Sequence, residues 1–370
     1  MIGRIGRGEY EVRPYESMAP LFHIPFMVGS WLYGAGVRSR VWWYQRGGGR
    51  VHTLGRPVVS VGNLTVGGTG KTPLVIALGE ALLARGVDVA VLSRGYGGGL
   101  ERVGGLVSDG SGRRPLDWTD AGDEPALIAR RLPQAAVIVG RDRASAWSRF
   151  GCTRPPGVCL LDDGFQHLAI ARDEDLLVLD ATESYADAAL LPRGRLREPL
   201  GALTRASVVV VTRVDQAAPG AVEAIEALVR RVRSDVPIFY ARFALSGLAA
   251  VGAGGTAPLD RLAGARVVAV AGIGRFESFV ALLERAGAKV VAALRFRDHY
   301  PYRRTDLDAV RARCRSVGAD FAVTTEKDAV KLEALVGADD VLWAARMDVR
   351  VEDASAWSAW LDRVARLVAA

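Results

Sequence analysis

A glycine-rich segment near the start of the chain has residue types that can bind the phosphates of a nucleotide. The stretch Val58–Pro73 reads VVSVGNLTVGGTGKTP, an apolar run that enters a glycine-rich turn and ends in Lys-Thr-Pro. Glycines let backbone N–H groups converge on phosphate oxygens, the Lys71 ammonium can neutralise the β- and γ-phosphates, and the Thr72 hydroxyl can bind Mg²⁺. The sequence therefore predicts a triphosphate site, although Thr65 stands where the usual pattern has its first glycine. The residues expected to contact the nucleotide are Thr65, Val66, Gly67, Gly68, Thr69, Gly70, Lys71 and Thr72.

Two adjacent carboxylates, Asp162 and Asp163, follow the apolar run Val158–Leu161. In enzymes with this type of phosphate loop, an aspartate at the end of a buried strand holds the metal, directly or through water. We therefore expect Mg²⁺ at this place, with Asp163 as the first choice of ligand. An acidic pair in a turn without any metal is the alternative. The other candidates for the metal environment are Thr72, Asp162, Glu124 and Glu198.

Seven short segments form one ordered set of motifs that extends over most of the chain. They are Val61–Pro73, Ser93–Gly97 (SRGYG), Gly122–Pro125 (GDEP), Asp162–His167 (DDGFQH), Leu191–Pro199 (LPRGRLREP), Asp298–Tyr300 (DHY) and Thr324–Leu332 (TTEKDAVKL). In type and order they resemble the tetraacyldisaccharide 4′-kinase family, the lipid A kinases of Gram-negative bacteria. The first and fourth segments are specific by themselves, and the shared order of the whole set is far more specific.

The resemblance implies a reaction and its setting. The γ-phosphate of ATP would be transferred to the 4′-hydroxyl of a tetraacylated glucosamine disaccharide 1-phosphate, giving lipid IVA. ATP and Mg²⁺ would be the cofactors, and the reaction would take place at the cytoplasmic face of the inner membrane. No nucleic acid and no obligate protein partner are expected.

The resemblance also assigns roles to particular residues. Asp123 would be the base that accepts the proton of the sugar hydroxyl, with His299 paired to it. Arg197 would neutralise charge on the transferring phosphoryl group together with Lys71, although Arg193 and Arg195 are equally near in sequence. Four further residues are expected to touch the substrate or to orient the side chains that touch it: Arg94, Tyr96, Gln166 and His167. Without the resemblance, Asp123 would be interpreted as a helix N-cap and His299 as a surface or packing residue.

One loop departs from the family pattern. Gly272-Ile273-Gly274 is followed by Arg275 and Phe276, where the family has Asn-Pro. The same loop is not a dinucleotide fingerprint, because Glu277 occupies the place of the third glycine. The segment Thr325–Lys331 carries no chemistry that the residues themselves reveal, and it is interpreted as the start of a helix.

The elements that position these residues follow an alternating pattern. Near-continuous apolar runs predict buried strands at Pro57–Val61, Asp88–Leu92, Ala136–Val139, Val158–Leu161, Leu176–Leu179 and Val208–Thr212. Helical patterns occupy Pro73–Arg85 and Pro125–Arg131. Buried strands that alternate with helices are typical of an α/β fold with a parallel sheet covered on both faces, as in P-loop NTPases.

A smaller α/β unit is predicted after residue 245. Its strands are expected at Val267–Val270, Val290–Leu294 and Phe321–Thr324, and its helices at Phe276–Ala286 and Asp306–Val317. Leu245–Pro258, rich in Gly and Ala, is interpreted as the join between the units. A strand at Val341–Val349 and a helix at Ala354–Val368 would return to the first unit. The expected division is 1–46, 47–244, 245–345 and 346–370.

Composition limits the partners of this protein. The 370 residues carry a formal net charge of +7, with a pI near 9.6, and half of them are hydrophobic. A basic protein favours anionic partners, but the arginines are spread along the chain, which argues against nucleic acid. A phosphorylated substrate or an acidic membrane surface fits better.

The N-terminal region predicts contact with a membrane surface. No residue from Ser17 to Val37 is charged, and Arg38, Arg40 and the aromatic run Trp42–Tyr44 follow. Aromatic and arginine side chains together suit the headgroup region of a bilayer. Pro20 and several glycines lower the hydrophobicity, which disfavours a transmembrane span. A helix packed on its own domain is the other alternative.

Two further functions remain open from the residues alone. An ATP-dependent ligase on a similar phosphate loop would give ADP and an amide product. A membrane-bound adaptor switched by ATP would hydrolyse ATP in response to a partner and phosphorylate no lipid.

Overall fold

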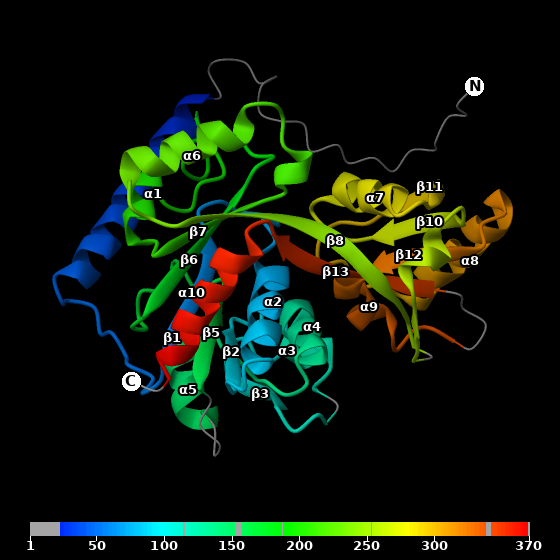
Figure 1. Ribbon diagram of the computed structural model, residues 1–370, viewed down its shortest axis with the longest axis horizontal. Coiled ribbons are helices and arrows are strands. Elements are labelled where there is room, and N and C mark those ends of the chain that lie inside the picture. Colours follow the sequence, from blue (N-terminus) through cyan, green and yellow to red (C-terminus); the bar gives the residue numbers. More distant parts are fainter. Residues whose placement is uncertain are drawn as a thin grey trace.

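The computed structural model describes residues 23–113, 115–151, 157–186, 188–252, 254–337 and 342–368. Two α/β units lie side by side and share one continuous sheet (Figure 1). The strand order is β11-β10-β12-β13-β8-β7-β6-β1-β5-β2-β4-β3, and β9 pairs with β8 beside this path. This confirms the predicted α/β fold with a large, mostly parallel sheet.

The first unit contains the phosphate loop and seven strands. They are β1 (Val58–Asn63), β2 (Val89–Ser93), β3 (Gly105–Asp109), β4 (Ala136–Val139), β5 (Val158–Asp162), β6 (Glu174–Asp180) and β7 (Val208–Thr212). All neighbours pair in parallel except β3, which runs antiparallel to β4 on the edge. The strands predicted for this unit are confirmed. β3 was not predicted, because its sequence GLVSD is short and begins with glycine.

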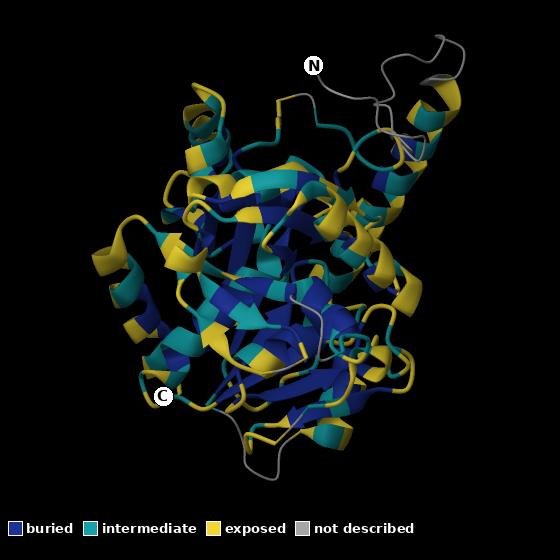
Figure 2. Ribbon diagram, turned by 90° about the vertical axis from the view of Figure 1, so that its right-hand side faces the viewer, coloured by how far each residue is buried: buried dark blue, intermediate teal, exposed yellow. Residues whose placement is uncertain are grey.

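Helices cover both faces of this first sheet. They are α2 (Lys71–Leu83), α3 (Trp118–Ala121), α4 (Asp123–Arg131), α5 (Arg143–Phe150), α6 (Ala221–Val232) and α10 (Ala354–Arg366), with 3-10 turns η3 (Leu200–Arg205) and η4 (Val214–Gln216). Alternate residues of one strand enter different cores: Val59 packs with α2, α4 and α10, whereas Val58 faces the side of α5. Strands buried on both faces explain the continuous apolar runs in the sequence, and Figure 2 shows the buried strands at the centre of the molecule.

The second unit is a smaller parallel arrangement. Its strands are β10 (Arg266–Ala271), β11 (Lys289–Arg295) and β12 (Phe321–Thr325), and its helices are α7 (Phe276–Arg285), α8 (Arg304–Val317) and α9 (Glu326–Leu332), with the turn η5 (Leu259–Leu262). β10 lies between β11 and β12, parallel to both. The strands and helices predicted here are confirmed.

The predicted join between the units, Leu245–Pro258, begins inside a strand. Leu245–Ala250 is not a loop but the end of one long strand, β8 (Ile238–Ala250). β8 pairs in parallel with β7 in its first part and antiparallel with β13 (Leu342–Val351) in the rest, while β9 (Thr256–Ala257) pairs with its end. The expected boundary at residue 245 therefore falls inside a strand.

The N-terminal helix α1 (His23–Gln45) lies on the first unit, far from the second (Figure 1). Ser30 Oγ donates to the carbonyl oxygen of Leu190 at 2.6 Å, and Tyr33 Oη donates to the carbonyl oxygen of Arg197 at 3.0 Å. The outer side exposes large apolar side chains, at Ile24, Met27, Val28, Trp31, Leu32, Trp42 and Trp43. Within the described residues, no helix has the length and apolar character needed to cross a bilayer. The charge-free residues 17–22 lie outside the described part of the chain.

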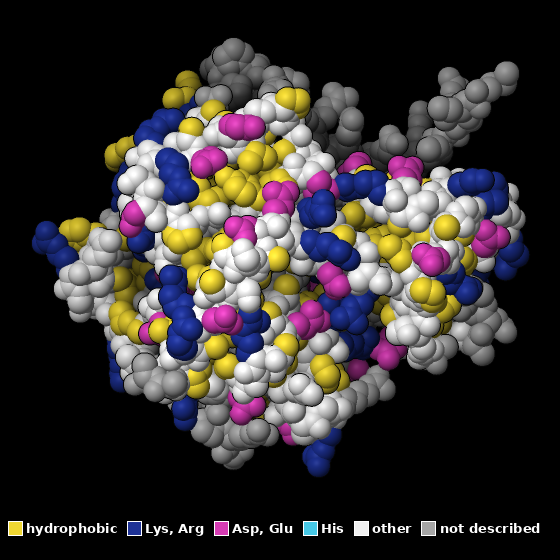
Figure 3. All heavy atoms as spheres, in the orientation of Figure 1, with side chains coloured by type: hydrophobic (Ala, Val, Ile, Leu, Met, Phe, Trp, Pro, Cys, Tyr) yellow, Lys and Arg dark blue, Asp and Glu magenta, His cyan; other side chains and the backbone are white. Residues whose placement is uncertain are grey.

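Charged residues of both signs are interspersed over the face of the molecule drawn in Figure 3. The arginines are therefore not gathered into one basic surface on this face, in keeping with their spread along the sequence.

Candidate active site

A cleft of about 450 Å³ lies between the two units. The phosphate loop and the carboxyl ends of β2 and β5 form its wall on the first unit, because parallel strands end at the same edge of a sheet. Loops that follow β10, β11 and β12 form the wall on the second unit. The lining includes Val66–Pro73, Arg94, Tyr96, Asp123, Glu124, Asp162, Asp163, Arg197, Arg213, Phe243, Ile273–Arg275, Asp298, His299 and Thr325–Lys327.

The phosphate loop is shaped by glycine and held from outside. Gly70, the N-cap of α2, has φ +89°, and a Cβ there would lie 2.1 Å from the ring of Phe243. The carbonyl oxygens of the loop accept hydrogen bonds from surrounding side chains: Arg195 Nη2 donates to Val66 at 2.7 Å and Arg213 Nη2 donates to Gly68 at 3.0 Å. The loop therefore leads into the N-terminus of α2, where backbone N–H groups and the helix dipole favour an anion.

Lys71, the first residue of α2, belongs to a polar network at the floor of the cleft. Its Nζ donates to Asn63 Oδ1 at 3.1 Å and lies 3.5 Å from Asp163 Oδ1. Arg197 binds the same two side chains: its Nη1 donates to Asp163 Oδ2 at 2.9 Å, and its Nη2 donates to Asn63 Oδ1 at 2.7 Å. Burial opposes ionisation, but the charges of Lys71 and Arg197 hold the pKa of Asp163 below its usual range. The structure thus joins the predicted cations Lys71 and Arg197 through Asp163.

Asp162, at the end of β5, has one oxygen engaged and one not. Ser93 Oγ donates to its Oδ2 at 2.9 Å, whereas its buried Oδ1 has no hydrogen-bond partner among the described residues. Burial, and then the charges of Glu124 and Asp163, raise the pKa of Asp162 to about 7. A buried carboxylate oxygen without a donor, in a cleft that Thr72 also lines, fits a hydrated divalent cation. The described residues hold no group of three His, Cys, Asp or Glu side chains able to bind a metal by themselves, so a nucleotide would have to complete such a site.

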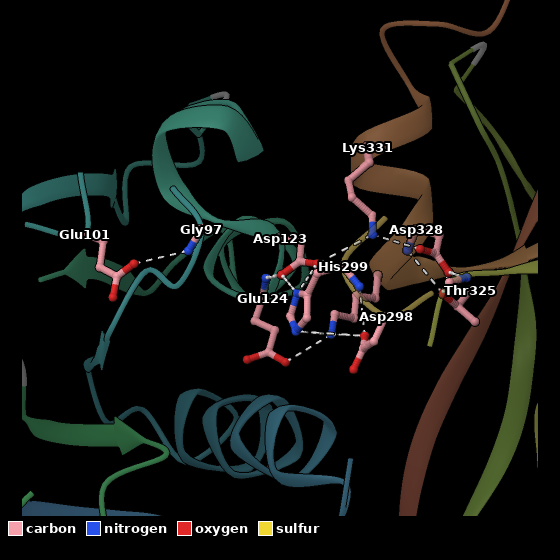
Figure 4. Close-up of polar contacts among 11 residues, drawn as sticks. Gly97, Glu101, Asp123, Glu124, Asp298, His299, Thr325, Asp328 and Lys331 are labelled. Atoms are coloured by element: carbon pink, nitrogen blue, oxygen red, sulfur yellow. Dashed lines mark hydrogen bonds and ion pairs between the residues drawn. The ribbon is translucent and has the colours of Figure 1, made fainter. Parts of the chain in front are cut away.

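Asp123 and His299 meet across the cleft (Figure 4). Asp123 is the first residue of α4 in the first unit, and His299 follows β11 in the second. Nδ1 of the imidazole lies 2.9 Å from Oδ2 of the carboxylate and 3.1 Å from Oδ1. The N-cap of α4 is Gly122 rather than Asp123, although Asp123 Oδ1 accepts from the N–H of Glu124 at 2.9 Å. The two side chains therefore form a pair that exists only when the units are close together.

Electrostatics keeps the Asp123 carboxylate ionised. Asp123 is only 5% exposed, and burial alone would raise its pKa. The hydrogen bond with His299, aided by the charges of Lys327 and Lys331, instead lowers the pKa of Asp123 to about 2. The same hydrogen bond raises the pKa of His299. At neutral pH the carboxylate is thus free of a proton and able to accept one.

Backbone conformation also singles out this region. Among the described residues, the non-glycine residues with positive φ are Asp163 at 49°, Arg213 at 57° and His299 at 58°. All of them line the cleft. Left-handed backbone outside glycine is unfavourable and gathers at functional sites.

Two lysines of α9 reach the site, and the sequence reasoning gave them no role. Lys327 Nζ lies 3.3 Å from Glu124 Oε1, 3.2 Å from Asp298 Oδ1 and 3.4 Å from His299 Nε2. Lys331 Nζ lies 3.6 Å from Asp123 Oδ2. A usable signal was present, because lysines four residues apart share one face of a helix.

Other predicted residues take different positions. Tyr96 packs edge-on against the ring of His299, with centroids 5.5 Å apart, and Arg94 pairs with Glu101 at 2.8 Å. Several predicted residues are not among those that line the cleft: Thr65, Gln166, His167 and Glu198. The buried Glu198 accepts from Arg205 with both oxygens, each over 2.9 Å. Gln166 Nε2 donates to the carbonyl oxygen of Asn63 at 3.0 Å, behind the phosphate loop.

Comparison with known proteins gives concordant matches. The family model described as tetraacyldisaccharide-1-P 4′-kinase matches residues 22–366. The tetraacyldisaccharide 4′-kinase of Geobacter metallireducens is 40% identical over 332 residues, covering 90% of this chain and 95% of its own length. That of Geobacter sulfurreducens is 41% identical, covering 90% and 91%. The crystal structure of LpxK from Aquifex aeolicus in complex with ATP superposes with a TM-score of 0.73 at 30% identity, covering 91% of this chain and 98% of that one.

Proposed function

This chain belongs to the tetraacyldisaccharide 4′-kinase family, and from that premise we propose how its cleft carries out the reaction. The protein is an ATP-dependent lipid kinase of lipid A biosynthesis, which phosphorylates the 4′-hydroxyl of a tetraacylated glucosamine disaccharide 1-phosphate. The residue roles, the metal and the membrane contact below are inferred from the contacts in the cleft.

The observation that carries the residue roles is the Asp123–His299 pair in the same cleft as Lys71. The sugar hydroxyl is a weak nucleophile, so a base must accept its proton as the oxygen attacks the γ-phosphorus. The ionised Asp123 carboxylate takes that proton, while His299 fixes the direction of the carboxylate. The new bond joins the 4′-oxygen to phosphorus, the bond from phosphorus to the β–γ bridging oxygen breaks, and ADP leaves.

Lys71 and Arg197 neutralise the charge that develops on the phosphoryl oxygens, since transfer depends mostly on alignment and charge. Both contact Asp163 in this structure, so the same carboxylate holds the two cations in place before a nucleotide arrives. Mg²⁺ bound with the nucleotide would add positive charge at the β- and γ-phosphates, and Thr72 and Asp162 are the residues that would hold it.

The substrate carries fatty acyl chains, so the enzyme must work at a membrane surface. The outer side of α1, with Trp31 the most exposed of its large apolar residues at 66%, supplies the contact. Aromatic side chains and arginines suit the headgroup region. Because ATP is a cytoplasmic nucleotide, we infer that this surface contacts the cytoplasmic face of the inner membrane.

The test uses purified protein, ATP labelled at the γ-phosphate and tetraacyldisaccharide 1-phosphate dispersed in detergent. Thin-layer chromatography should show the label in the lipid, in an amount that depends on added lipid. ATP hydrolysis without labelled lipid would overturn the proposal and favour an ATP-switched adaptor. ADP formed together with an amide product would favour a ligase.

A further inference from the structure

The chain contains 48 basic residues, and only four of them are lysines: Lys71, Lys289, Lys327 and Lys331. Lys71 and Lys327 line the cleft, and the Nζ atom of Lys331 lies 3.6 Å from Oδ2 of Asp123. A lysine ammonium is a compact charge that fits where a planar guanidinium does not. In a chain that otherwise uses arginine, the lysines are concentrated where the chemistry takes place.

Lys331 is held inside the second unit. Its side chain is 1% exposed, and Nζ lies 2.9 Å from Oδ1 of the fully buried Asp328. The ammonium also lies 5.4 Å from the centre of the Tyr302 ring. Asp328 is itself fixed, because its Oδ2 accepts from the N–H of Gly272 and from Thr325 Oγ1, each at 2.9 Å. The position of the ammonium is therefore set by a rigid group of second-unit residues.

From that place Lys331 points across the cleft at Asp123 (Figure 4). Its Nζ lies 3.6 Å from Oδ2, the same oxygen that His299 approaches at 2.9 Å. Although it pairs with two carboxylates, Nζ makes no hydrogen bond of good geometry among the described residues. A buried ammonium left in this way is costly, so it draws Asp123 towards it when the units close.

We propose that Lys331 is a positioning residue, which fixes the Asp123 carboxylate from the second unit so that it faces the sugar hydroxyl only when the cleft is closed. This inference rests on the proposed function, since it concerns the residue assigned as the base. His299 and Lys331 both approach Oδ2 of the carboxylate, while Oδ1 accepts from the N–H of Glu124 at 2.9 Å. Lys327 completes the surroundings of the pair through Glu124, Asp298 and His299.

The experiment measures kcat and KM of Lys331→Ala with labelled ATP and dispersed lipid. A misplaced catalytic group costs roughly 10²-fold in rate, so kcat should fall by about that factor while KM for ATP stays within twofold. Ethylammonium chloride should restore part of the lost kcat in Lys331→Ala, and should not raise kcat of the wild type. Lys289→Met is the matched control, because Lys289 is exposed at the start of β11, and it should match the wild type.

Asp328→Asn separates positioning from simple folding. The asparagine keeps an acceptor for Gly272 but removes the charge that holds the Lys331 ammonium, which remains next to Asp123. The kcat should therefore fall, but by less than in Lys331→Ala. A purely structural ion pair predicts an equal loss in Asp328→Asn and Lys331→Ala. If Lys331→Ala does not fold, the double variant Asp328→Asn/Lys331→Met removes both charges together. Its kcat should then be reduced as expected for Lys331→Ala.

The inference is overturned if the kcat of Lys331→Ala, or of the double variant, is close to that of the wild type. It is also overturned if Asp328→Asn and Lys331→Ala lose equal factors in kcat, or if ethylammonium does not raise the kcat of Lys331→Ala. A wild-type enzyme that puts no label into lipid would instead refute the proposed function.

Discussion

Arg275, on the loop that follows β10, donates from Nη2 to Oδ2 of Asp180 at the end of β6, over 2.9 Å. The same guanidinium reaches Thr182 Oγ1 at 2.9 Å and Glu183 Oε1 at 2.8 Å. This is a contact between the two units beside the phosphate loop, and Arg275 is also where the chain departs from the Asn-Pro of the family pattern. Arg275 therefore provides an ion pair between the two units.

Arg275→Ala should weaken the closed form of the cleft. Loss of a partly exposed guanidinium with several acceptors costs about 1–2 kcal/mol, so the Kd for ATP should rise several-fold. Isothermal titration calorimetry measures this change. Arg295→Ala is the control, because Arg295 pairs with Glu277 inside the second unit with both side chains exposed. Equal ATP affinity in Arg275→Ala and wild type would contradict the expectation.

Asp123→Asn should stop phosphoryl transfer without preventing nucleotide binding. The amide keeps the shape of the side chain but cannot accept the proton, and loss of a general base costs about 10²–10⁴-fold in kcat. Steady-state kinetics and ATP titration give the two quantities separately. Asp120→Asn, an exposed acid on the adjacent helix α3, should behave like the wild type. An unchanged kcat in Asp123→Asn would remove Asp123 from the role of base.

His167 should make stability sensitive to mild acid. Burial, reinforced by the charges of Arg143 and Arg40, lowers the pKa of His167 from 6.5 to about 4. Its folded-state pKa is depressed, so its stabilising contribution is complete above pH 6.5 and is lost as pH falls towards 4. Below about pH 6 the unfolded chain binds a proton there that the folded protein excludes.

Urea unfolding of the wild type and of His167→Gln, at about pH 7.5 and about pH 5, tests this expectation. The free energy of unfolding of the wild type should fall more between the two conditions than that of the variant. His52→Gln serves as the control from the same unit. Parallel losses in all three proteins would show that other groups cause the acid sensitivity.

Trp31→Glu should weaken binding to anionic liposomes. The side chain is 66% exposed on the outer side of α1, so a charge there alters the membrane contact without disturbing the contacts of Ser30 and Tyr33 with the first unit. Cosedimentation should show a several-fold loss of bound protein. Val51→Glu places the same charge at an exposed apolar residue outside α1 and should bind like the wild type. Equal cosedimentation of Trp31→Glu and the control would exclude α1 as the anchor.

The sequence predicted those parts of the fold that carry a local signal. The buried strands appear as apolar runs, and the phosphate loop as spaced glycines before Lys-Thr. No part of β8 was predicted. In its second half Gly247 and the alanines around it resemble a loop, and the strand state depends on pairing with β13, about a hundred residues later. Long-range pairing overrides local preference in such segments.

The candidate site shows the same limit. Asp123 and His299 are 176 residues apart, and no spacing rule could join them, so only the family resemblance paired them. The sequence predicted no role for Lys331, because its neighbours Val330 and Leu332 are core residues and do not indicate a charged environment. Its role becomes visible once α9 is placed beside α4.

The long strands β8 and β13 have a mechanical consequence for this enzyme. β7 pairs with β8 as far as Ala241 and β12 pairs with β13 as far as Ala345, while Arg242–Leu245 pair with Met347–Arg350 between these points. The twist between adjacent strands is larger in a two-stranded ribbon than in a wide sheet. Along this stretch a ribbon of two strands joins the parts of the sheet that carry the two walls of the cleft, so the twist of the ribbon sets how far apart those walls stand.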